Sequence, residues 1–505
     1  MAQRHLLIIA LITTLASGYT FADAIENPAG SGNWTISGTS GPSDHYLIDG
    51  GTDPNPTITV DATTDIAINS FTLPFISIAA PDYTVNIASG AKMINSNSGG
   101  LFTLEAGHTN FNIAGELSGG DYRVIAANVA GAPSWSINLT GSAISTHSNI
   151  LLLGQGGNDS LTLEPGSTLA SGGGSVTLRG GTDTVTFNGG TMNNVSGFRF
   201  EDGDDQLELN FAPSSTTRFL GGSGTDTVTL TNNGSYTLDT LESGWEVLTM
   251  NGSSWTLTGT TTNTFSNAIN LNSGNLTLSN TADITIAGAL TGAGTLTKSG
   301  GHTLFLTGSS THTGLIDIQS GQLTVNGSTT SNIQISATAR LAGGGSLGSA
   351  QMNGTLAPGN SPETLTVNGD LDLTSTSVLE FELDTSGTIG SSVNDLVEVN
   401  GNLTLDGTLN ITDLGNYGLG TYRLINYTGS LSDNGLTIGS QPNGFSGSID
   451  TSTAGQVNLI VSALGTNTSG NVHALPAIGI PGLALLIFTL ILTGLAAVRH
   501  GKLTR

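Results

Sequence analysis

Residues 292–325 read GAGTLTKSGGHTLFLTGSSTHTGLIDIQSGQLTV, and this stretch decides the fold class of the chain. Apolar and polar residues alternate in three runs, at 295–298, 303–307 and 315–325, and corners rich in Gly and Ser separate the runs. Since successive side chains of a strand point to opposite faces, each run predicts a short strand with one buried face. Such strands with tight corners are typical of one rung of a β-solenoid, which buries its apolar face only between neighbouring rungs.

The composition agrees with many such rungs. The chain has 505 residues, of which 72 are Gly and none is Cys; 10% are charged and 37% are hydrophobic. Lys, Glu and Ala are scarce, which argues against long helices outside the two termini. The hydrophobic residues recur at alternating positions, which indicates a buried core rather than a disordered chain.

The charge balance excludes one class of partner. All 37 acidic residues lie between Asp23 and Asp450, and only eight basic residues share that span, so the segment carries an excess of 29 negative charges. Nucleic-acid binding needs a basic surface, so no nucleic acid is expected as a partner. The excess is compatible with cation binding or with a well-solvated extracellular surface.

The two ends of the chain carry targeting signals. Residues 1–24 have a basic start, an apolar run and an A-x-A cleavage site that ends at Ala24, with Ala16-Ser17-Gly18 as an alternative site, and they predict a secretory signal peptide. Residues 478–498 are apolar for about 20 residues, which is enough to cross a bilayer as a helix. The basic residues that follow predict a cytoplasmic tail.

A second repeat lies between residues 151 and 230. Its four copies have the form Gly-x-Asp-x-(Leu/Val), each leads into an alternating strand, and their aspartates are Asp159, Asp183, Asp205 and Asp226. These aspartates are separated by 24, 22 and 21 residues, which is one per predicted coil. Stacked coils would therefore align them as a ladder along one edge of the solenoid.

This aspartate ladder is the candidate metal site. Residues 221–229 (GGSGTDTVT) fit every defined position of the calcium motif G-G-x-G-x-D-x-U-x, although that motif normally recurs every nine residues rather than once per coil. The other three copies are degenerate. The simpler interpretation is a solenoid corner whose Asp accepts hydrogen bonds from its own turn. Repulsion between stacked carboxylates nevertheless favours a bound cation, so Ca²⁺ is a hypothesis and no other cofactor is required.

Catalytic signals are weak. The densest acidic cluster, residues 201–205 (EDGDD), has Arg199 and Arg218 nearby, and grouped carboxylates with a basic residue occur in some β-helix enzymes that cleave polyuronic sugars. A general acid also needs a raised pKa in a cleft, and the His residues show no metal-type spacing. The four Trp residues are possible carbohydrate platforms, but each lies within or beside an alternating run, which favours packing in the core or at its edge.

Several motifs match a family pattern. Residues 292–298 (GAGTLTK) begin as G-x-G-x-L-x-K, residues 310–314 (STHTG) stand at an NTYTG-like corner, and residues 321–325 (GQLTV) end as G-x-L-x-V. From about residue 287 to residue 461 the chain resembles the autotransporter-associated β-strand repeat and the carboxyl part of autotransporter passengers. The resemblance implies a right-handed parallel β-helix at the cell surface. The residue patterns themselves predict an all-β fold, a β-solenoid, followed by one C-terminal hydrophobic helix.

The C-terminal segment departs from that family. Residues 475–482 (LPAIGIPG) are similar to bacterial sorting signals of the PEP-CTERM type, in the variant I-P-T-L-x-x-W-G, although the Trp is absent. The resemblance implies that a membrane protease of the exosortase class cuts near Pro476. The plainer alternative is a permanent anchor through residues 478–498.

The sequence thus predicts six segments: a signal peptide (1–24), an N-terminal cap with irregular coils (25–150), G-x-D coils (151–244), autotransporter-type coils (245–461), a flexible spacer (462–474) and a C-terminal sorting signal or membrane helix with a basic tail (475–505). We expect an exported structural or adhesive protein at the cell surface, in the outer membrane or outside the cell, with transient or permanent inner-membrane anchoring. Its expected partners are extracellular polysaccharide or other cell surfaces. The alternative is a polysaccharide-acting lyase or glycoside hydrolase on the same fold.

Overall fold

The computed structural model describes residues 23–463, apart from short internal segments that lie mostly before residue 155 and end with residue 360. Most of the predicted signal peptide and the whole predicted sorting signal, Pro476 included, lie outside the described residues, whereas Ala24 falls in strand β1 (Asp23–Glu26). In the described part the regular elements are strands, and no helix there is long and apolar enough to span a membrane.

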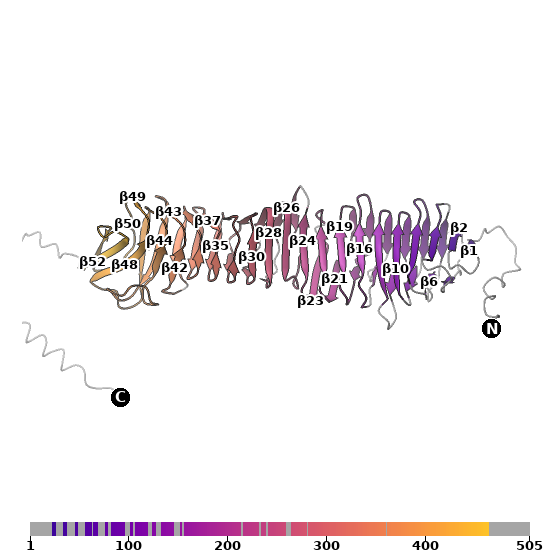
Figure 1. Ribbon diagram of the computed structural model, residues 1–505, viewed down its shortest axis with the longest axis horizontal. Helices are drawn as coiled ribbons and strands as arrows, with labels where there is room; N and C mark the ends of the chain where they lie inside the picture. The colour runs from indigo at the N-terminus through magenta and orange to yellow at the C-terminus, as the bar shows by residue number, and fades with distance from the viewer. Residues whose placement is uncertain are drawn as a thin grey trace, which may run out of the picture. The chain divides into compact units, whose positions relative to one another are not determined.

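The described strands coil into a solenoid, which Figure 1 shows as a stack of short strands across one long axis. They form sheets of 21, nine, eight, eight and six strands, in which neighbours come from successive coils. Pairing within the stack is parallel, for example between β32 (Thr303–Leu306) and β35 (Gly321–Val325). The predicted all-β solenoid is therefore confirmed in the described residues.

The stretch at residues 292–325 spans parts of two coils. Besides β32 and β35 it forms β31 (Thr295–Lys298) and β34 (Leu315–Ile318), and β31 pairs with β34 while β32 pairs with β35. The prediction that this stretch makes one rung is wrong for that reason. The third run begins the next coil, because its first strand, β34, lies beside β31 of the preceding coil. The strand that precedes it, β33 (Ser309–Ser310), is too short to show alternation.

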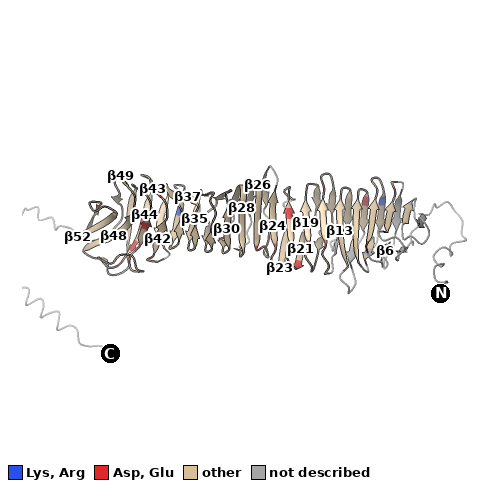
Figure 2. Cartoon of the chain, in the orientation of Figure 1, with Lys and Arg blue, Asp and Glu red and all other residues tan. Residues whose placement is uncertain are grey.

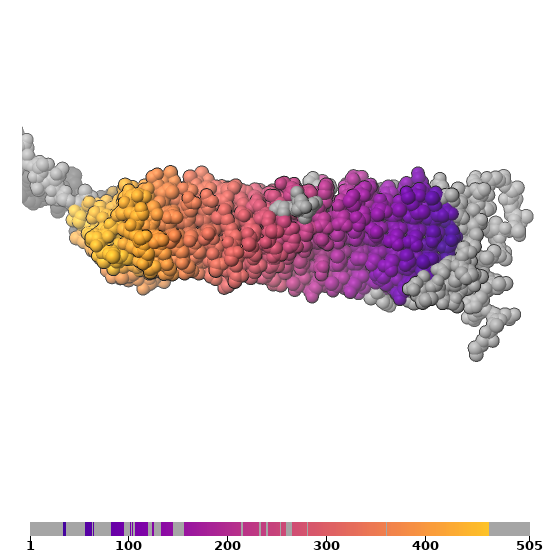
Figure 3. Space-filling model, turned by 45° about the horizontal axis from the view of Figure 1, so that its top comes forward, coloured from indigo at the N-terminus to yellow at the C-terminus, as the bar shows by residue number. Residues whose placement is uncertain are grey.

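The middle coils build their core from aligned apolar columns. They contribute to the 21-stranded sheet the strands β13 (Ser134–Leu139), β16 (Ser160–Leu163), β19 (Thr184–Phe187), β22 (Gln206–Leu209), β24 (Thr227–Thr231) and β26 (Val247–Leu257). Leu161, Val185, Leu207 and Val228 are in register on successive coils and are at most 1% exposed. Burying one such side chain contributes about 1.5–3 kcal/mol, so each coil depends on its neighbours. The coils follow one another as continuous bands in Figure 3.

Antiparallel pairs occur at both ends of the stack. At the N-terminal end β1 pairs with β2 (Trp34–Ser37), and at the C-terminal end β48 (Gly420–Tyr427) pairs with β52 (Gln456–Ala463). The rings of Tyr417 and Tyr422 stack near the C-terminal end with centroids 5.1 Å apart. The last rung of an open stack has no neighbour to pair with. A change of strand direction at each end therefore terminates the parallel ladder.

One face of the later coils is the nine-stranded sheet. Besides β32 and β35 its strands are β27 (Thr264–Phe265), β29 (Ile284–Ile286), β38 (Ala339–Gly343), β41 (Thr355–Pro358), β44 (Val378–Leu383), β47 (Thr408–Asp413) and β50 (Thr437–Ile438). Leu323, Leu341, Leu356 and Leu379 form its inward column and are fully buried. The alternate positions therefore point outward.

Candidate functional site

The four repeat aspartates stand directly before strands of the 21-stranded sheet. Asp159, Asp183, Asp205 and Asp226 precede β16, β19, β22 and β24, and these strands pair in register. Each aspartate lies two positions before a buried residue of its strand. Side chains two positions apart point to the same face, so the aspartate side chain points into the solenoid. All four are at most 1% exposed.

A continuous chain of hydrogen bonds joins the ladder from coil to coil. The backbone N–H of Asp159 donates to Oδ1 of Asp183 over 2.7 Å, that of Asp183 to Oδ1 of Asp205 over 2.7 Å, and that of Asp205 to Oδ1 of Asp226 over 2.9 Å. In the opposite direction, the backbone carbonyl of each aspartate accepts a bond from the strand of the next coil. Each carboxylate thus satisfies a corner N–H that would otherwise be buried without an acceptor.

The glycines of the repeat permit this close stacking. Gly203 has a φ of +148°, and a Cβ there would lie 1.6 Å from the carbonyl oxygen of Gly181. Gly224 has a φ of +137°, and its Cβ would lie 1.8 Å from the carbonyl oxygen of Gly203. No L-residue with a side chain fits either position, so the Gly-x-Asp form follows from the corner geometry.

The second oxygen of each ladder carboxylate is buried without a protein partner. No described group bonds Oδ2 of Asp159, Asp183, Asp205 or Asp226. Burial raises the pKa of these carboxyls, to about 8 for Asp159, about 7 for Asp183 and Asp226, and about 6 for Asp205. The bonded N–H groups lower the pKa and the neighbouring carboxylates raise it, but desolvation is the largest cause.

Glu246 extends the ladder by one coil, and the sequence pattern missed it. Val247 aligns with Thr227, which places Glu246 above Asp226, and Glu246 Oε2 accepts the N–H of Asp226 over 2.9 Å. Residues 244–248 (GWEVL) repeat the pattern with Glu in place of Asp. A search that allowed either acid would have found it.

The calcium hypothesis receives no support from grouped ligands. Among the described residues no three His, Cys, Asp or Glu side chains gather closely enough to hold a metal ion. Ca²⁺ takes about six to eight oxygen ligands, whereas each ladder aspartate offers one unengaged oxygen. Calcium binding stays a prediction, and the hydrogen-bonded corner is the role that the geometry describes.

The other candidates from the sequence do not converge. Arg218 forms an ion pair with Glu242 at 3.0 Å instead of joining the acidic cluster at 201–205. Trp135, Trp245 and Trp255 are at most 3% exposed, and Trp34 packs against the core, so the packing interpretation of the Trp residues is confirmed. Charged residues are few along the described stack, and most are acidic (Figure 2).

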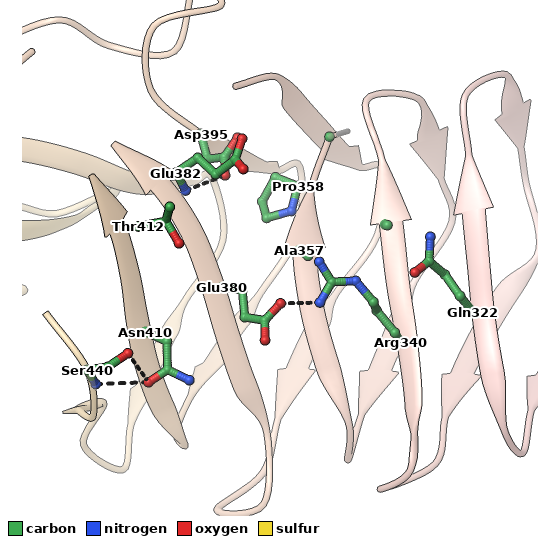
Figure 4. Close-up of a pocket in the computed structure, with 12 residues that line it drawn as sticks. Gln322, Arg340, Ala357, Pro358, Glu380, Glu382, Asp395, Asn410, Thr412 and Ser440 are labelled. Atoms are coloured by element: carbon green, nitrogen blue, oxygen red, sulfur yellow. Dashed lines mark hydrogen bonds and ion pairs between the residues drawn. The ribbon is translucent and has the colours of Figure 1, made fainter. Parts of the chain in front are cut away.

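A groove of about 560 Å³ lies on the outward face of the nine-stranded sheet. Its lining consists of small residues flanked by polar side chains: Ala342, Ala357, Pro358 and Gly359 between Gln322 and Arg340 on one side and Glu380, Glu382, Asp395, Asn410, Thr412 and Ser440 on the other. These residues come from five strands and the adjoining loops (Figure 4). The hollow exists because β38 and β41 carry Ala342 and Ala357 in register, while β44 carries the longer Glu380 and Glu382.

Polar contacts cross the groove between coils. The Arg340 guanidinium reaches over the position of Ala357 and forms an ion pair with Glu380, two coils away (Figure 4). At the far end the Ser440 N–H and hydroxyl donate to Oδ1 of Asn410 over 2.9 and 3.0 Å. No hydrogen bond or ion pair from the described residues engages the Glu382 carboxylate, which is partly exposed.

A buried Asn-Asp pair shapes the edge of the groove. Asp395 accepts the N–H of Glu382 at 2.7 Å and that of Glu363 at 3.1 Å, and burial raises its pKa to about 7. Asn394 accepts the N–H of Asp384 at 2.6 Å and donates to the carbonyls of Thr385 and Thr388, each at 2.8 Å. The pair fixes the loop that follows β44. In the sequence this stretch stands out only through the family resemblance.

Comparisons with known proteins cover part of the chain. No protein-family model matches it. A stretch of 118 residues is 57% identical to the autotransporter adhesin BmaC of Brucella suis biovar 1 (strain 1330). The stretch is 23% of this chain and 3% of that adhesin's own length. Part of this chain is therefore similar to a small part of an autotransporter adhesin.

Proposed function

We propose that this protein is a surface-exposed β-solenoid with an adhesive or structural role. The observation that carries the proposal is a stack of coils whose buried acids serve the backbone and whose outward face bears a polar groove. The partial similarity to an autotransporter adhesin supports the same class of function. The mechanism is presentation, in which a stiff stack of coils holds polar strand faces towards polysaccharide or another cell.

The enzymatic alternative is less favoured. Catalysis of glycan cleavage needs a pair of carboxyl groups placed across the scissile bond, one of them with a raised pKa. In the groove the carboxyl with the raised pKa is Asp395, which is 1% exposed, and both of its oxygens accept backbone N–H groups. A buried, doubly bonded carboxyl is poorly placed to give a proton to a substrate.

The adhesive role is tested with the exported chain on the surface of a non-adherent bacterium. We expect cells that display it to bind polysaccharide-coated surfaces or other cells more than cells that display an unrelated solenoid. Release of reducing ends or unsaturated sugars from the same polysaccharide would favour the enzyme instead. Binding equal to that of the control cells would refute the adhesive role.

For export we propose that residues 1–24 direct secretion and that the C-terminal segment is processed near Pro476 by a sorting protease. The sequence patterns at the two ends support this route. Mass spectrometry of the protein from its native host tests it. A mature C-terminus near Pro476 is expected, and an intact Arg505 would favour a permanent anchor through residues 478–498.

A further inference from the structure

Polar groups line the groove on several strands of the nine-stranded sheet. Arg340 lies on β38, Glu380 and Glu382 on β44, and Asn410 on β47. Neighbouring strands of a sheet are about 4.8 Å apart, so these groups are separated by multiples of the coil spacing, and β41 between them contributes only small residues. The arrangement suits a polymer laid along the solenoid axis, across the strands, with one monomer over each coil.

An extended peptide does not match this spacing. Side chains on one face of an extended peptide recur after about 6.6 Å, so they lose register with groups about 4.8 Å apart within two coils. A pyranose unit of an extended glycan has a length similar to the coil spacing. The spacing of the polar groups therefore favours a glycan over a peptide.

The groups in the groove can bond hydroxyls. No described group engages the Glu382 carboxylate, so both of its oxygens are available as acceptors. Asn410 uses its Oδ1 for Ser440, and the orientation leaves its NH₂ as a donor. Arg340 has five N–H donors and pairs with a single carboxylate, so donors remain for a ligand.

The charge of the groove decides between classes of glycan. One cation, Arg340, stands against the carboxyls of Glu380, Glu382 and Asp395. Since Asp395 is buried and bonded to the backbone, Glu382 is the carboxylate that meets a ligand. A glycan that carries carboxylates would face like charge here, whereas hydroxyl and amino groups would find acceptors.

We propose that this groove binds an extended, non-acidic glycan, neutral or amino-bearing, that runs along the solenoid axis across β38, β41, β44 and β47. The glycan would lie over the Arg340–Glu380 ion pair, which covers Ala357, with the Glu382 carboxylate beside it. This inference rests on the proposed adhesive function and names the chemical class of its ligand.

Titration calorimetry of the full chain tests the groove with three hexamers of equal length: β-1,4-linked glucosamine, cellohexaose and galacturonic acid. We expect the first two to bind and the galacturonic acid hexamer not to bind. Glu382→Gln is expected to weaken the glucosamine hexamer about tenfold, because a charge-assisted hydrogen bond is lost. Glu201→Gln, the same change at an exposed carboxylate of β21 (Gly197–Asp202) far from the groove, should leave the affinity unchanged.

Three results would overturn the inference: no binding of either non-acidic hexamer, equal binding of the galacturonic acid hexamer, or equal losses in Glu382→Gln and Glu201→Gln. An unchanged melting temperature in both variants shows that the fold is intact. If the groove fails this test while displayed cells still adhere, the glycan assignment is wrong and the adhesive role stands. If adhesion is also absent, both proposals fail.

Discussion

The G-x-D coils and the coils beneath the groove use acidic side chains in opposite ways. In the G-x-D coils, Asp183 and its three counterparts point inward, are at most 1% exposed and accept backbone N–H groups. In the groove coils, Glu380 and Glu382 are partly exposed and point outward from β44. The difference of one position along a strand thus separates a carboxylate that joins coils from one that can meet a ligand.

The two regions also differ in how well their buried polar groups are satisfied. Each ladder aspartate leaves Oδ2 without a partner among the described residues. In the later coils the buried ring of His312 has Ser331 Oγ at 2.7 Å and the carbonyl of Gly294 at 2.8 Å, one partner for each ring nitrogen. Burial raises the pKa of the ladder carboxyls and lowers the pKa of His312. The stability of the G-x-D coils and that of the coil that holds His312 should therefore respond to pH with opposite sign.

The largest expected effect is a loss of stability in the G-x-D coils as pH rises. The folded pKa values of about 6 to 8 exceed the ordinary 3.8, so the folded state binds more protons than the unfolded state. The stability that the protonated ladder contributes is full below about pH 4 and is lost as pH rises through 6 to 8. Hydrogen-exchange protection of the β19 and β22 amides measures it.

The matched variant for this prediction replaces all four ladder aspartates with Asn. Asn keeps an oxygen acceptor and removes the charge, so the protection of these coils should become nearly independent of pH. A variant that retains the full pH response would show that other groups titrate.

A smaller effect is expected when one ladder carboxylate is removed. In Asp183→Ala the N–H of Asp159 loses its acceptor, and a buried unsatisfied donor costs about 1–3 kcal/mol. Asp183→Asn is the control, since it keeps the acceptor. Denaturation at about pH 5, where the ladder is mostly protonated, should separate the two variants. Equal stabilities would mean that the hydrogen bond contributes little.

Around His312 the pH response should be smaller and reversed, because His312 is one group with a lowered pKa whereas the ladder has four carboxyls with raised pKa values. The pKa of His312 is below 6.5 in the folded state, so the unfolded state takes up the proton first on acidification. Stability contributed by the neutral ring is present above pH 6.5 and declines as pH falls below it. Exchange protection around β34 is expected to decrease at about pH 5, and His312→Gln should abolish the change. If exchange protection still decreases in His312→Gln, another group is responsible for the pH response.

The smallest expected effect concerns calcium. If the ladder binds Ca²⁺, millimolar calcium should raise the melting temperature slightly at about pH 8, where the carboxylates are ionised. The variant with four Asn residues should not respond. An unchanged melting temperature of the wild-type chain would show that the ladder does not bind calcium. Protons would then be the ions that the ladder binds.

The fold and the ladder were largely predictable, because both depend on spacing along the chain. Alternation located β31, β32, β34 and β35, and the separations of the four aspartates predicted that they align. Glu246 escaped because the pattern specified Asp. Part of the order of strands within a coil also escaped, since β33 has two residues and shows no alternation.

The groove was not predictable from the sequence. Arg340 and Glu380 are 40 residues apart, and they meet only because Ala357 leaves room between their strands. The loop that holds Asp395 lengthens one coil, so no fixed period relates the residues on either side of it. Outward positions carry no hydrophobic signal, and a hollow made of small residues is visible only once the coils are stacked.

We assign coil-to-coil bonding to the ladder aspartates and ligand binding to Glu382. The most direct test of this assignment measures melting and binding in two variants. Glu382→Gln and the variant with four Asn residues are compared with the wild-type chain for glucosamine-hexamer affinity and melting temperature at about pH 8. The account predicts that Glu382→Gln weakens binding about tenfold at an unchanged melting temperature, while the Asn variant melts at a higher temperature and binds as the wild type does. Lost binding in the Asn variant at an unchanged melting temperature, with normal binding in Glu382→Gln, would contradict it.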